Sequence, residues 1–287
     1  MSKTIVWFAC LLLFSFNGIA QVKEPNNTHP EWSKPYPPFR IVGNLYYVGT
    51  YDLACYLLVT PQGNILINTG LADSEPLIRK SIEALHFKYT DTKILLTTQA
   101  HFDHLGGMAA VKKATGAKLM IDEKDAEVVK DGGSSDYEMG GHGSVFAPVM
   151  PDRLLHDKDV IKLGNTQIVM LHHPGHTKGS CSFLFDVNDG HKQYKVLIAN
   201  LPTIINDEKF ADVKKYPDIA KDFAYTLSAM KKLQFDIWLA SHASQFSLQA
   251  KHKPGDAYNP AVFVDREGYD NALAELKKKY DEKLKQK

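Results

Sequence analysis

The sequence predicts a layered α/β fold in which β-sheets lie in the middle and helices lie outside. Short apolar strands alternate with amphipathic helices along both halves of the chain, and neither an internal repeat nor a linker divides it. The 287 residues are 44% hydrophobic and 23% charged, a globular composition with enough length for a sizeable core. We therefore expect a single domain over residues 21–287.

The N-terminal half begins with an arm over residues 21–40 that is rich in Pro, Asn and charge and is expected to be irregular. Strands are expected at 44–48, 56–60 and 64–68, the last two joined by a Pro61-Gln62-Gly63 turn. A helical apolar period follows the candidate cap Ser74 and predicts a helix over 75–87. A strand, a helix, a strand and a helix are then expected at 94–96, 105–114, 117–121 and 123–130.

The C-terminal half opens with a Gly-rich stretch, residues 132–151, that has no regular pattern. A loop this long in a compact domain is usually functional or mobile, so we expect it to border the substrate through apolar residues such as Met139. The alternative is a solvated connector. Strands are expected at 160–163, 167–171, 181–187, 194–199 and 236–240, and helices at 219–233 and 266–285.

Residues 1–20 are predicted to be a secretory signal peptide. Residues 5–16 are apolar except for Ser15, a run too short for a bilayer span of about 20 residues, and Gly18 and Ala20 precede a cleavage site before Gln21. The alternatives are a buried N-terminal helix or a membrane anchor. Export predicts a periplasmic location, and Cys55 and Cys181 then either pair or remain buried thiols.

The charge balance excludes some partners. Lys plus Arg number 34 and Asp plus Glu 33, a formal net charge of +1 without a long basic block. This pattern lacks the electrostatic footprint of a nucleic-acid-binding protein and the polybasic patch of a membrane-bound one. We expect a monomer that acts on a small molecule, without nucleic acid and without a stable membrane anchor.

The segment LLTTQAHFDHLGG, residues 95–107, carries the strongest chemical signal. His101, Asp103 and His104 come directly after a buried strand, and Gly106-Gly107 lets the chain turn into a helix. A strand end that points into a cleft is where α/β folds place ligands. Imidazole and carboxylate groups are the ligands that Zn²⁺ binds, so the segment predicts a metal site.

Histidines also follow two later strands. His172, His173 and His176 come after the strand at 167–171, and His242 comes after the strand at 236–240. Each histidine alone is more often an ordinary surface or hydrogen-bonded core residue, but three strand ends with the same pattern indicate one convergent site. His172 or His173 is expected to donate its ring N–H to a neighbouring acid.

The segments TTQAHFDHLGG, HHPGHTKGS and ASHASQF resemble the metal motifs of the metallo-β-lactamase superfamily. Its signature is H-x-H-x-D-H, then a His in a GHT context, then a late His. Within the superfamily the chain resembles subclass B3, and in particular the GOB-type enzymes with Gln at the first motif position. The resemblance runs from about residue 41 to the C terminus, and it implies an αβ/βα sandwich of two central mixed β-sheets flanked by helices.

The resemblance also implies one or two bound zinc ions. The first site would be formed by Gln99, His101 and His176, and the second by Asp103, His104 and His242. A neutral amide oxygen is a weaker zinc ligand than imidazole, so we expect the second site to be the tighter one. The alternative is that Gln99 is a polar bystander, which leaves two protein ligands at the first site.

Three residues of the segment IANLPT bear on the same comparison. Asn200 and Leu201 stand where glyoxalase II-like hydrolases have a metal-bridging Asp, and many B3 enzymes have a Ser near Leu201 that helps to hold a water. Neither residue here is a carboxylate, and Leu cannot hold a water. Thr203 is expected to contact the substrate carboxylate, because B3 enzymes use a hydroxyl residue near this position.

The function implied by the resemblance is zinc-dependent hydrolysis of the amide bond of penicillins, cephalosporins and carbapenems, which confers antibiotic resistance. Asp103 is the predicted catalytic residue, since it can hold zinc and also orient the attacking water; the alternative is pure ligation. One rival is a thioester or lactone hydrolase of the same superfamily, against which the missing bridging Asp and the export signal argue. The other is a non-catalytic metal-binding protein on the same fold.

Overall fold

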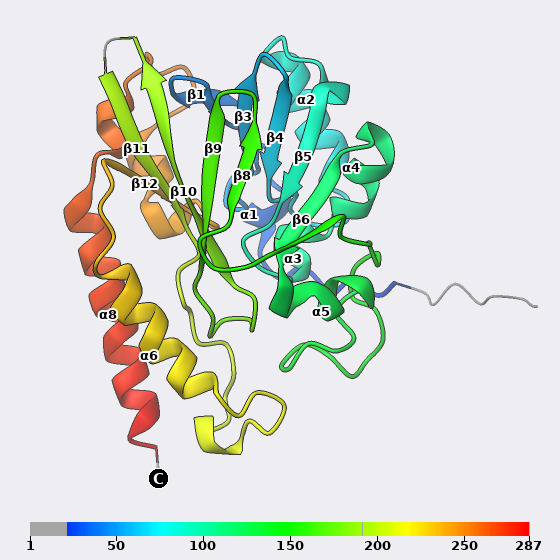
Figure 1. Cartoon of the computed structure of the whole chain (residues 1–287), viewed down its shortest axis with the longest axis vertical. Coiled ribbons are helices and arrows are strands. Elements are labelled where there is room, and N and C mark those ends of the chain that lie inside the picture. The colour runs from blue at the N-terminus through cyan, green and yellow to red at the C-terminus, as the bar shows by residue number, and fades with distance from the viewer. Residues whose placement is uncertain (1–21, 191, 287) are drawn as a thin grey trace, which may run out of the picture.

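The computed structural model describes residues 22–190 and 192–286, in which two mixed β-sheets pack face to face with helices on both outer sides (Figure 1). This arrangement confirms the predicted αβ/βα sandwich. The predicted signal peptide, residues 1–20, lies outside the described residues. Within the described part, no helix combines the length and the apolar character needed to cross a bilayer.

The first sheet has its seven strands in chain order. They are β1 (Phe39–Val42), β2 (Leu45–Tyr47), β3 (Tyr56–Thr60), β4 (Gly63–Ile67), β5 (Thr92–Leu96), β6 (Lys118–Asp122) and β7 (Arg153–Leu155). Pairing is antiparallel from β1 to β4 and parallel from β4 to β7. Helices α2 (Glu75–Ala84) and α4 (Met108–Thr115) flank this sheet on its outer side (Figure 1).

The second sheet has the strand order β12-β11-β10-β9-β8. Its strands are β8 (Val160–Leu163), β9 (Thr166–His172), β10 (Cys181–Asp189), β11 (Lys192–Ala199) and β12 (Ile237–Ala240). Only β11 and β12 pair in parallel, and the other pairs are antiparallel. Helices α6 (Ile219–Met230) and α8 (Arg266–Leu284) flank the outer side of this sheet (Figure 1).

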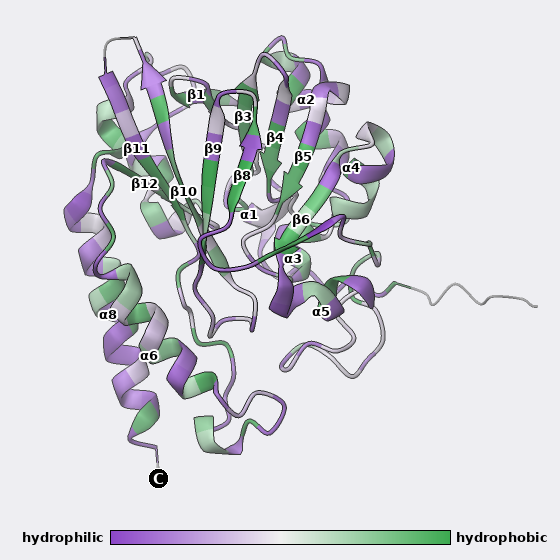
Figure 2. Cartoon of the chain, in the orientation of Figure 1, coloured by the Kyte–Doolittle hydropathy of each residue, from purple (hydrophilic) through white to green (hydrophobic). Residues whose placement is uncertain are grey.

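The alternation of side chains along the central strands divides the core into two layers. Ile65, Ile67, Ile94 and Leu96 belong to the layer shared with the second sheet, whereas their neighbours Leu66 and Leu95 pack in the layer under α2 and α4. Figure 2 shows how strongly apolar the central strands are and how many hydrophilic residues α8 carries. Because both faces of β4 and β5 are buried, a register slip is costly, and the end of β5 is held in a fixed position.

The predicted helix over 105–114 is wrong at its start. The structure has two helices here, α3 (Phe102–Leu105) and α4, with Gly106 and Gly107 between them. A Cβ at Gly106 would lie 2.5 Å from the Phe102 carbonyl oxygen and 2.6 Å from the Ala72 nitrogen, so glycine is needed for the close approach of α3 to that backbone. The early start of α3 places Asp103 and His104 on a helix rather than in a loop.

Other elements differ from the prediction at edges and ends. The arm contains the short helix α1 (Pro30–Ser33), and β7 and the short helix α7 (Leu248–Lys251) were not predicted. The helix predicted over 123–130 is a 3₁₀ turn followed by α5 (Ala126–Lys130). Ser74 does not cap α2 through its side chain, because its hydroxyl accepts a hydrogen bond from the Leu71 N–H. Cys55 and Cys181 are both buried free thiols.

Candidate metal centre

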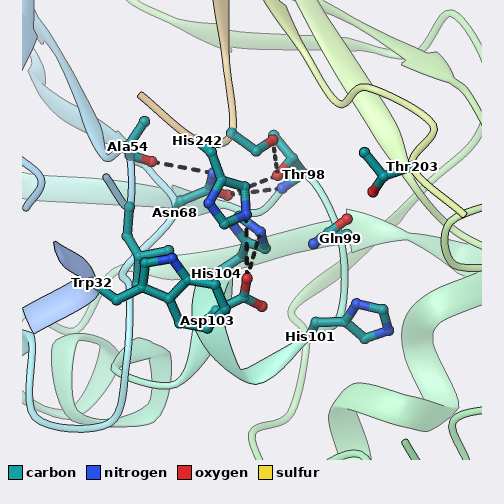
Figure 3. A network of polar contacts seen from close by, with 12 residues as sticks. Trp32, Ala54, Asn68, Thr98, Gln99, His101, Asp103, His104, Thr203 and His242 are labelled. Atoms are coloured by element: carbon teal, nitrogen blue, oxygen red, sulfur yellow. Dashed lines mark hydrogen bonds and ion pairs between the residues drawn. The ribbon is translucent and has the colours of Figure 1, made fainter. Parts of the chain in front are cut away.

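Three predicted metal ligands form a compact group at the end of β5 and β12. One donor atom each of Asp103, His104 and His242 lies within 4.8 Å of the others. Asp103 Oδ2 lies 3.2 Å from His104 Nε2 and 3.4 Å from His242 Nε2. Figure 3 shows the carboxylate beside both imidazoles. The structure thus brings together the three residues predicted for the second site, although they come from segments about 140 residues apart in the sequence.

The other three predicted ligands line the same cavity. His101 Nδ1 lies 3.1 Å from His176 Nε2, so the two imidazoles turn ring nitrogens toward each other. Gln99 is 3% exposed, and its Oε1 has no hydrogen-bond partner among the described residues. Gln99, His101, Asp103, His176 and His242 all line one cavity of about 280 Å³. The predicted first site is therefore adjacent to the second.

The electrostatics of the second site centre on Asp103. Burial by itself would raise the pKa of Asp103, but His104 and His242 hold it well below its usual value. Burial would lower the pKa of His242, yet hydrogen bonds to Asp103 and Asp52 raise it to about 9. Burial also lowers the pKa of His104. Zinc binds imidazole in its neutral form, so metal binding at these residues would release the proton that His242 carries in the metal-free chain.

The first site is less charged. Burial is the main cause that lowers the pKa of His176 to about 3, so this imidazole is neutral and able to bind metal. Burial opposes protonation of His101 as well, but Asp136 Oδ2, 3.4 Å from His101 Nε2, raises the pKa of His101 overall. Two imidazoles and one amide give this site no ionised ligand of its own.

The unpaired polar atoms of the cavity test whether a metal fits. Gln99 Oε1, His101 Nε2 and both ring nitrogens of His104 are buried without a hydrogen-bond partner among the described residues. Each such group costs about 1–3 kcal/mol when it is left unsatisfied. A cation bound by Gln99 Oε1 at the first site and another bound by His104 Nε2 at the second would each remove one of these costs. Imidazole, carboxylate and amide donors together suit Zn²⁺, so the residues present fit the metal.

The Gly-rich loop at 132–151 packs against the first site. Met139 lines the cavity, and the Tyr137 hydroxyl donates a hydrogen bond to the His176 carbonyl oxygen at 3.2 Å. Thr203 also lines the cavity, and His176 Nδ1 lies 2.8 Å from the Thr203 carbonyl oxygen and 2.9 Å from its Oγ1. The loop therefore borders the cavity, while substrate contacts of Met139 and Thr203 stay predictions.

Asn200 and Leu201 are occupied elsewhere. The Asn200 amide donates to the Thr98 carbonyl oxygen at 3.2 Å, and Leu201 is 4% exposed in the core between the sheets. The two other histidines of the HHPGH segment contact residues outside the proposed ligand set. His172 Nδ1 lies 2.6 Å from Asp122 Oδ2, which agrees with the expected acid partner, and His173 Nδ1 lies 2.7 Å from Ser182 Oγ.

Asp125, which no sequence motif singled out, holds the two loops that carry the first-site residues. Its carboxylate accepts hydrogen bonds from the Ala100 N–H at 3.0 Å, the Thr177 hydroxyl at 2.8 Å and the Gly179 N–H at 2.7 Å. Burial is the main cause that raises its pKa to about 6. Asp125 follows β6, so the same rule of polar residues after strands could have found it.

Asn68 plays a similar part behind Gln99, directly after β4. Its Oδ1 accepts hydrogen bonds from the Thr98 N–H at 2.9 Å and the Thr98 hydroxyl at 3.2 Å, and its amide donates to the Ala54 carbonyl oxygen (Figure 3). The backbone of Asn68 has φ of 63°, a left-handed conformation that Asn tolerates better than most residues. These bonds fix the path of the chain from β5 to Gln99.

The chain is similar to metallo-β-lactamases, one of which is described as a di-zinc enzyme. The model of the metallo-β-lactamase superfamily matches residues 50–189. The class B3 di-zinc metallo-β-lactamase LRA-12 from an Alaskan soil metagenome is 67% identical, with 92% of this chain and 100% of that chain covered and a TM-score of 0.91. The metallo-β-lactamase GOB-18 from Elizabethkingia meningoseptica is 56% identical, with coverage of 93% and 99% and a TM-score of 0.92.

Curated relatives are more distant. A probable hydroxyacylglutathione hydrolase from Schizosaccharomyces pombe is 30% identical over 156 residues, which are 53% of this chain and 51% of that protein. The chain thus spans about half the length of the curated relatives it matches. The similarity to the two solved structures, in contrast, covers nearly their full length.

Proposed function

The chain belongs to the class B3 metallo-β-lactamase family, and from this premise we propose that it hydrolyses the amide bond of β-lactam antibiotics with bound zinc. The observation that carries the proposal is the convergence of two adjacent donor groups, Asp103 with two imidazoles and Gln99 with two imidazoles, on one cavity. Penicillins, cephalosporins and carbapenems are the proposed substrates, and antibiotic resistance is the proposed consequence.

The chemistry divides between metal and protein. Zinc, when bound, supplies Lewis-acid polarisation and a nucleophile at neutral pH. Asp103, His104 and His242 would hold the second ion, and Gln99, His101 and His176 the first. Both close contacts of Asp103 use Oδ2. Its Oδ1 is therefore available to accept a hydrogen bond from the attacking water and to direct it at the lactam carbonyl carbon.

Cleavage of the carbon–nitrogen bond also requires a proton for the leaving nitrogen. When the water oxygen adds to the carbonyl carbon and the carbon–nitrogen bond breaks, the nitrogen leaves with an electron pair and takes up the proton that the water loses. Asp103 stays ionised because its pKa is held low, which suits a hydrogen-bond acceptor that orients the water rather than a base that carries its proton. Met139 and Thr203 line the cavity where the substrate would lie, and we propose them as substrate contacts.

The setting of the enzyme is also proposed. The predicted signal peptide supports export to the periplasm, where β-lactams meet their targets. The small cavity supports a small-molecule substrate, and we propose that the enzyme acts as a monomer without a membrane anchor.

A thioester hydrolase is the competing function, and its support is the partial similarity to hydroxyacylglutathione hydrolases and acyl-coenzyme A thioesterases. Asn200 and Leu201 argue against it, because one is committed to a backbone hydrogen bond and the other is buried in the core. A comparison of substrates decides between the two. We expect the purified zinc-loaded chain lacking residues 1–20 to hydrolyse a carbapenem and to leave a glutathione thioester intact. Thioester hydrolysis without β-lactam hydrolysis would overturn the proposal.

Replacing Gln99 with His tests the ranking of the two sites. Imidazole is the better donor for zinc, so Gln99→His is expected to raise first-site affinity by about tenfold or more, which is about 1.4 kcal/mol. Calorimetric zinc titration with activity followed in parallel measures both sites, and wild type is expected to fill the second site at lower free zinc. Gln193→His, the same change on exposed β11, is the control. Two equally tight sites in wild type, unchanged in Gln99→His, would show the ranking to be wrong.

A further inference from the structure

The N-terminal arm, of which the structure describes residues 22–38 ahead of β1, covers one side of the cavity. Its residues Asn26, Thr28, His29 and Trp32 line the cavity together with the predicted ligands. The Trp32 ring lies 5.6 Å from the His242 ring and 6.2 Å from the Phe102 ring, centroid to centroid, and the His29 ring stacks on it at 4.5 Å. Figure 3 shows Trp32 beside His242 and Asp103. The arm is therefore in contact with the second site.

Asp52 connects the arm to that site. Its Oδ2 lies 3.1 Å from Trp32 Nε1 and 3.0 Å from His242 Nδ1, so one carboxylate oxygen accepts from both rings. Its Oδ1 accepts a hydrogen bond from the Ser244 N–H at 2.8 Å, and its carbonyl oxygen accepts one from the Ala243 N–H. Asp52 is 7% exposed, so this carboxylate is fixed by donors on both oxygens and is nearly closed to water.

The bond from His242 to Asp52 decides which ring nitrogen can bind metal. When Nδ1 carries the proton and donates it to Asp52, Nε2 keeps its lone pair, and Nε2 is the nitrogen 3.4 Å from Asp103. His176 has a weaker arrangement, because its Nδ1 faces the neutral carbonyl oxygen of Thr203. Asp52 thus fixes the tautomer and the ring orientation of His242 and makes it a stronger donor.

Trp32 adds a neutral donor to the same oxygen. The indole N–H can only donate, so it pairs with the Asp52 carboxylate. Because Trp32 belongs to the arm, this hydrogen bond forms only while the arm lies on the cavity. The indole ring also lies beside the His242 ring, tilted by 45° against it. The placement of Trp32 and the orientation of His242 then both depend on one carboxylate, so metal binding that stabilises one also stabilises the other.

We propose that Asp52 is a positioning residue for the second metal site and that Trp32 docks the N-terminal arm onto that site through Asp52. The inference rests on the proposed zinc site. It predicts that zinc at the second site stabilises the docked arm, and that the docked arm in turn strengthens zinc binding. The arm is then a part of the second site.

The experiment compares Asp52→Asn and Trp32→Phe with wild type in the zinc-free chain lacking residues 1–20. Zinc titration by calorimetry reads both sites, and hydrogen exchange of the arm amides reads docking. We expect Asp52→Asn to weaken the second site by about 10- to 100-fold and to leave the first within a few-fold. We expect zinc to slow arm exchange in wild type and to do so much less in either variant. Asp212→Asn, an exposed surface carboxylate, is the matched control.

Tryptophan fluorescence gives an independent signal. Trp7 lies in the predicted signal peptide, and Trp238 is 1% exposed and packed against Tyr269 of α8, so Trp32 is the tryptophan next to the site. The fluorescence change on zinc addition is expected in wild type and absent in Trp32→Phe.

Each outcome has a separate meaning. Unchanged second-site affinity in Asp52→Asn, or equal weakening of both sites, would refute the positioning role. Arm exchange that does not respond to zinc in wild type would refute the docking role. A wild-type chain that binds no zinc would contradict the proposed function itself.

Discussion

Replacing Asp103 with alanine is expected to lower kcat/KM for a β-lactam by about 10³-fold or more, which is about 4 kcal/mol of transition-state stabilisation. Asp103 Oδ2 is the atom that His104 and His242 share, at 3.2 Å and 3.4 Å. Its removal takes the only ionised donor from the second ligand set and the acceptor proposed to orient the water. Two buried imidazoles are left without the carboxylate that balances a bound cation.

The variant separates two roles when zinc occupancy and turnover are measured on the same sample. If Asp103→Ala is filled with two zinc ions at saturating metal and remains inactive, the carboxylate orients the nucleophile as well as binding zinc. If saturating zinc restores turnover, Asp103 acts through ligation alone. Asp212→Asn controls for the loss of a carboxylate far from the site. Near-normal turnover in Asp103→Ala at limiting zinc would refute both roles.

The parts of the fold that could be predicted are those whose pattern is local. Strands β3 and β8 occur at the predicted residues because each is a short apolar run bounded by turn residues. Strand β7 was missed because Arg153 and Leu154 are exposed at the edge of the sheet, where alternation is lost. The break between α3 and α4 depends on the approach of Gly106 to the Ala72 backbone, a contact that no local pattern encodes.

The candidate site divides in the same way. The six proposed zinc ligands could be proposed because each follows a strand and because their motifs resemble a known family. Asp52 could not be proposed as a positioning residue from the sequence, since its role depends on the contact with His242, which lies 190 residues away. Trp32 looked like part of an irregular arm, and only the folded chain puts its indole against the same carboxylate. Residues that orient the metal ligands do so through contacts between segments far apart in the sequence, so they are identified only from the structure.

Removal of zinc with a chelator is expected to abolish β-lactam hydrolysis and to leave the fold intact. Activity should be lost because the proposed hydrolysis takes its Lewis acid and its nucleophile from bound zinc. The fold should persist because both core layers are built from apolar residues of the sheets and helices. Zinc at 100 times its dissociation constant adds about 2.7 kcal/mol of stability, so chelation should lower Tm by roughly 5–10 °C.

Adding metal back to the chelated protein shows whether zinc acts at a specific site or as any divalent cation would. Added Zn²⁺ should restore both activity and Tm, while Mg²⁺ should restore neither, because four of the six proposed ligands are imidazoles and Mg²⁺ prefers oxygen. Chelation also returns Gln99 Oε1 and His104 Nε2 to the unsatisfied state seen in the protein alone, which is the physical source of the lower Tm. Activity that survives exhaustive metal removal would sink the metalloenzyme assignment, and a Tm unchanged by zinc would show that these atoms bind no ion.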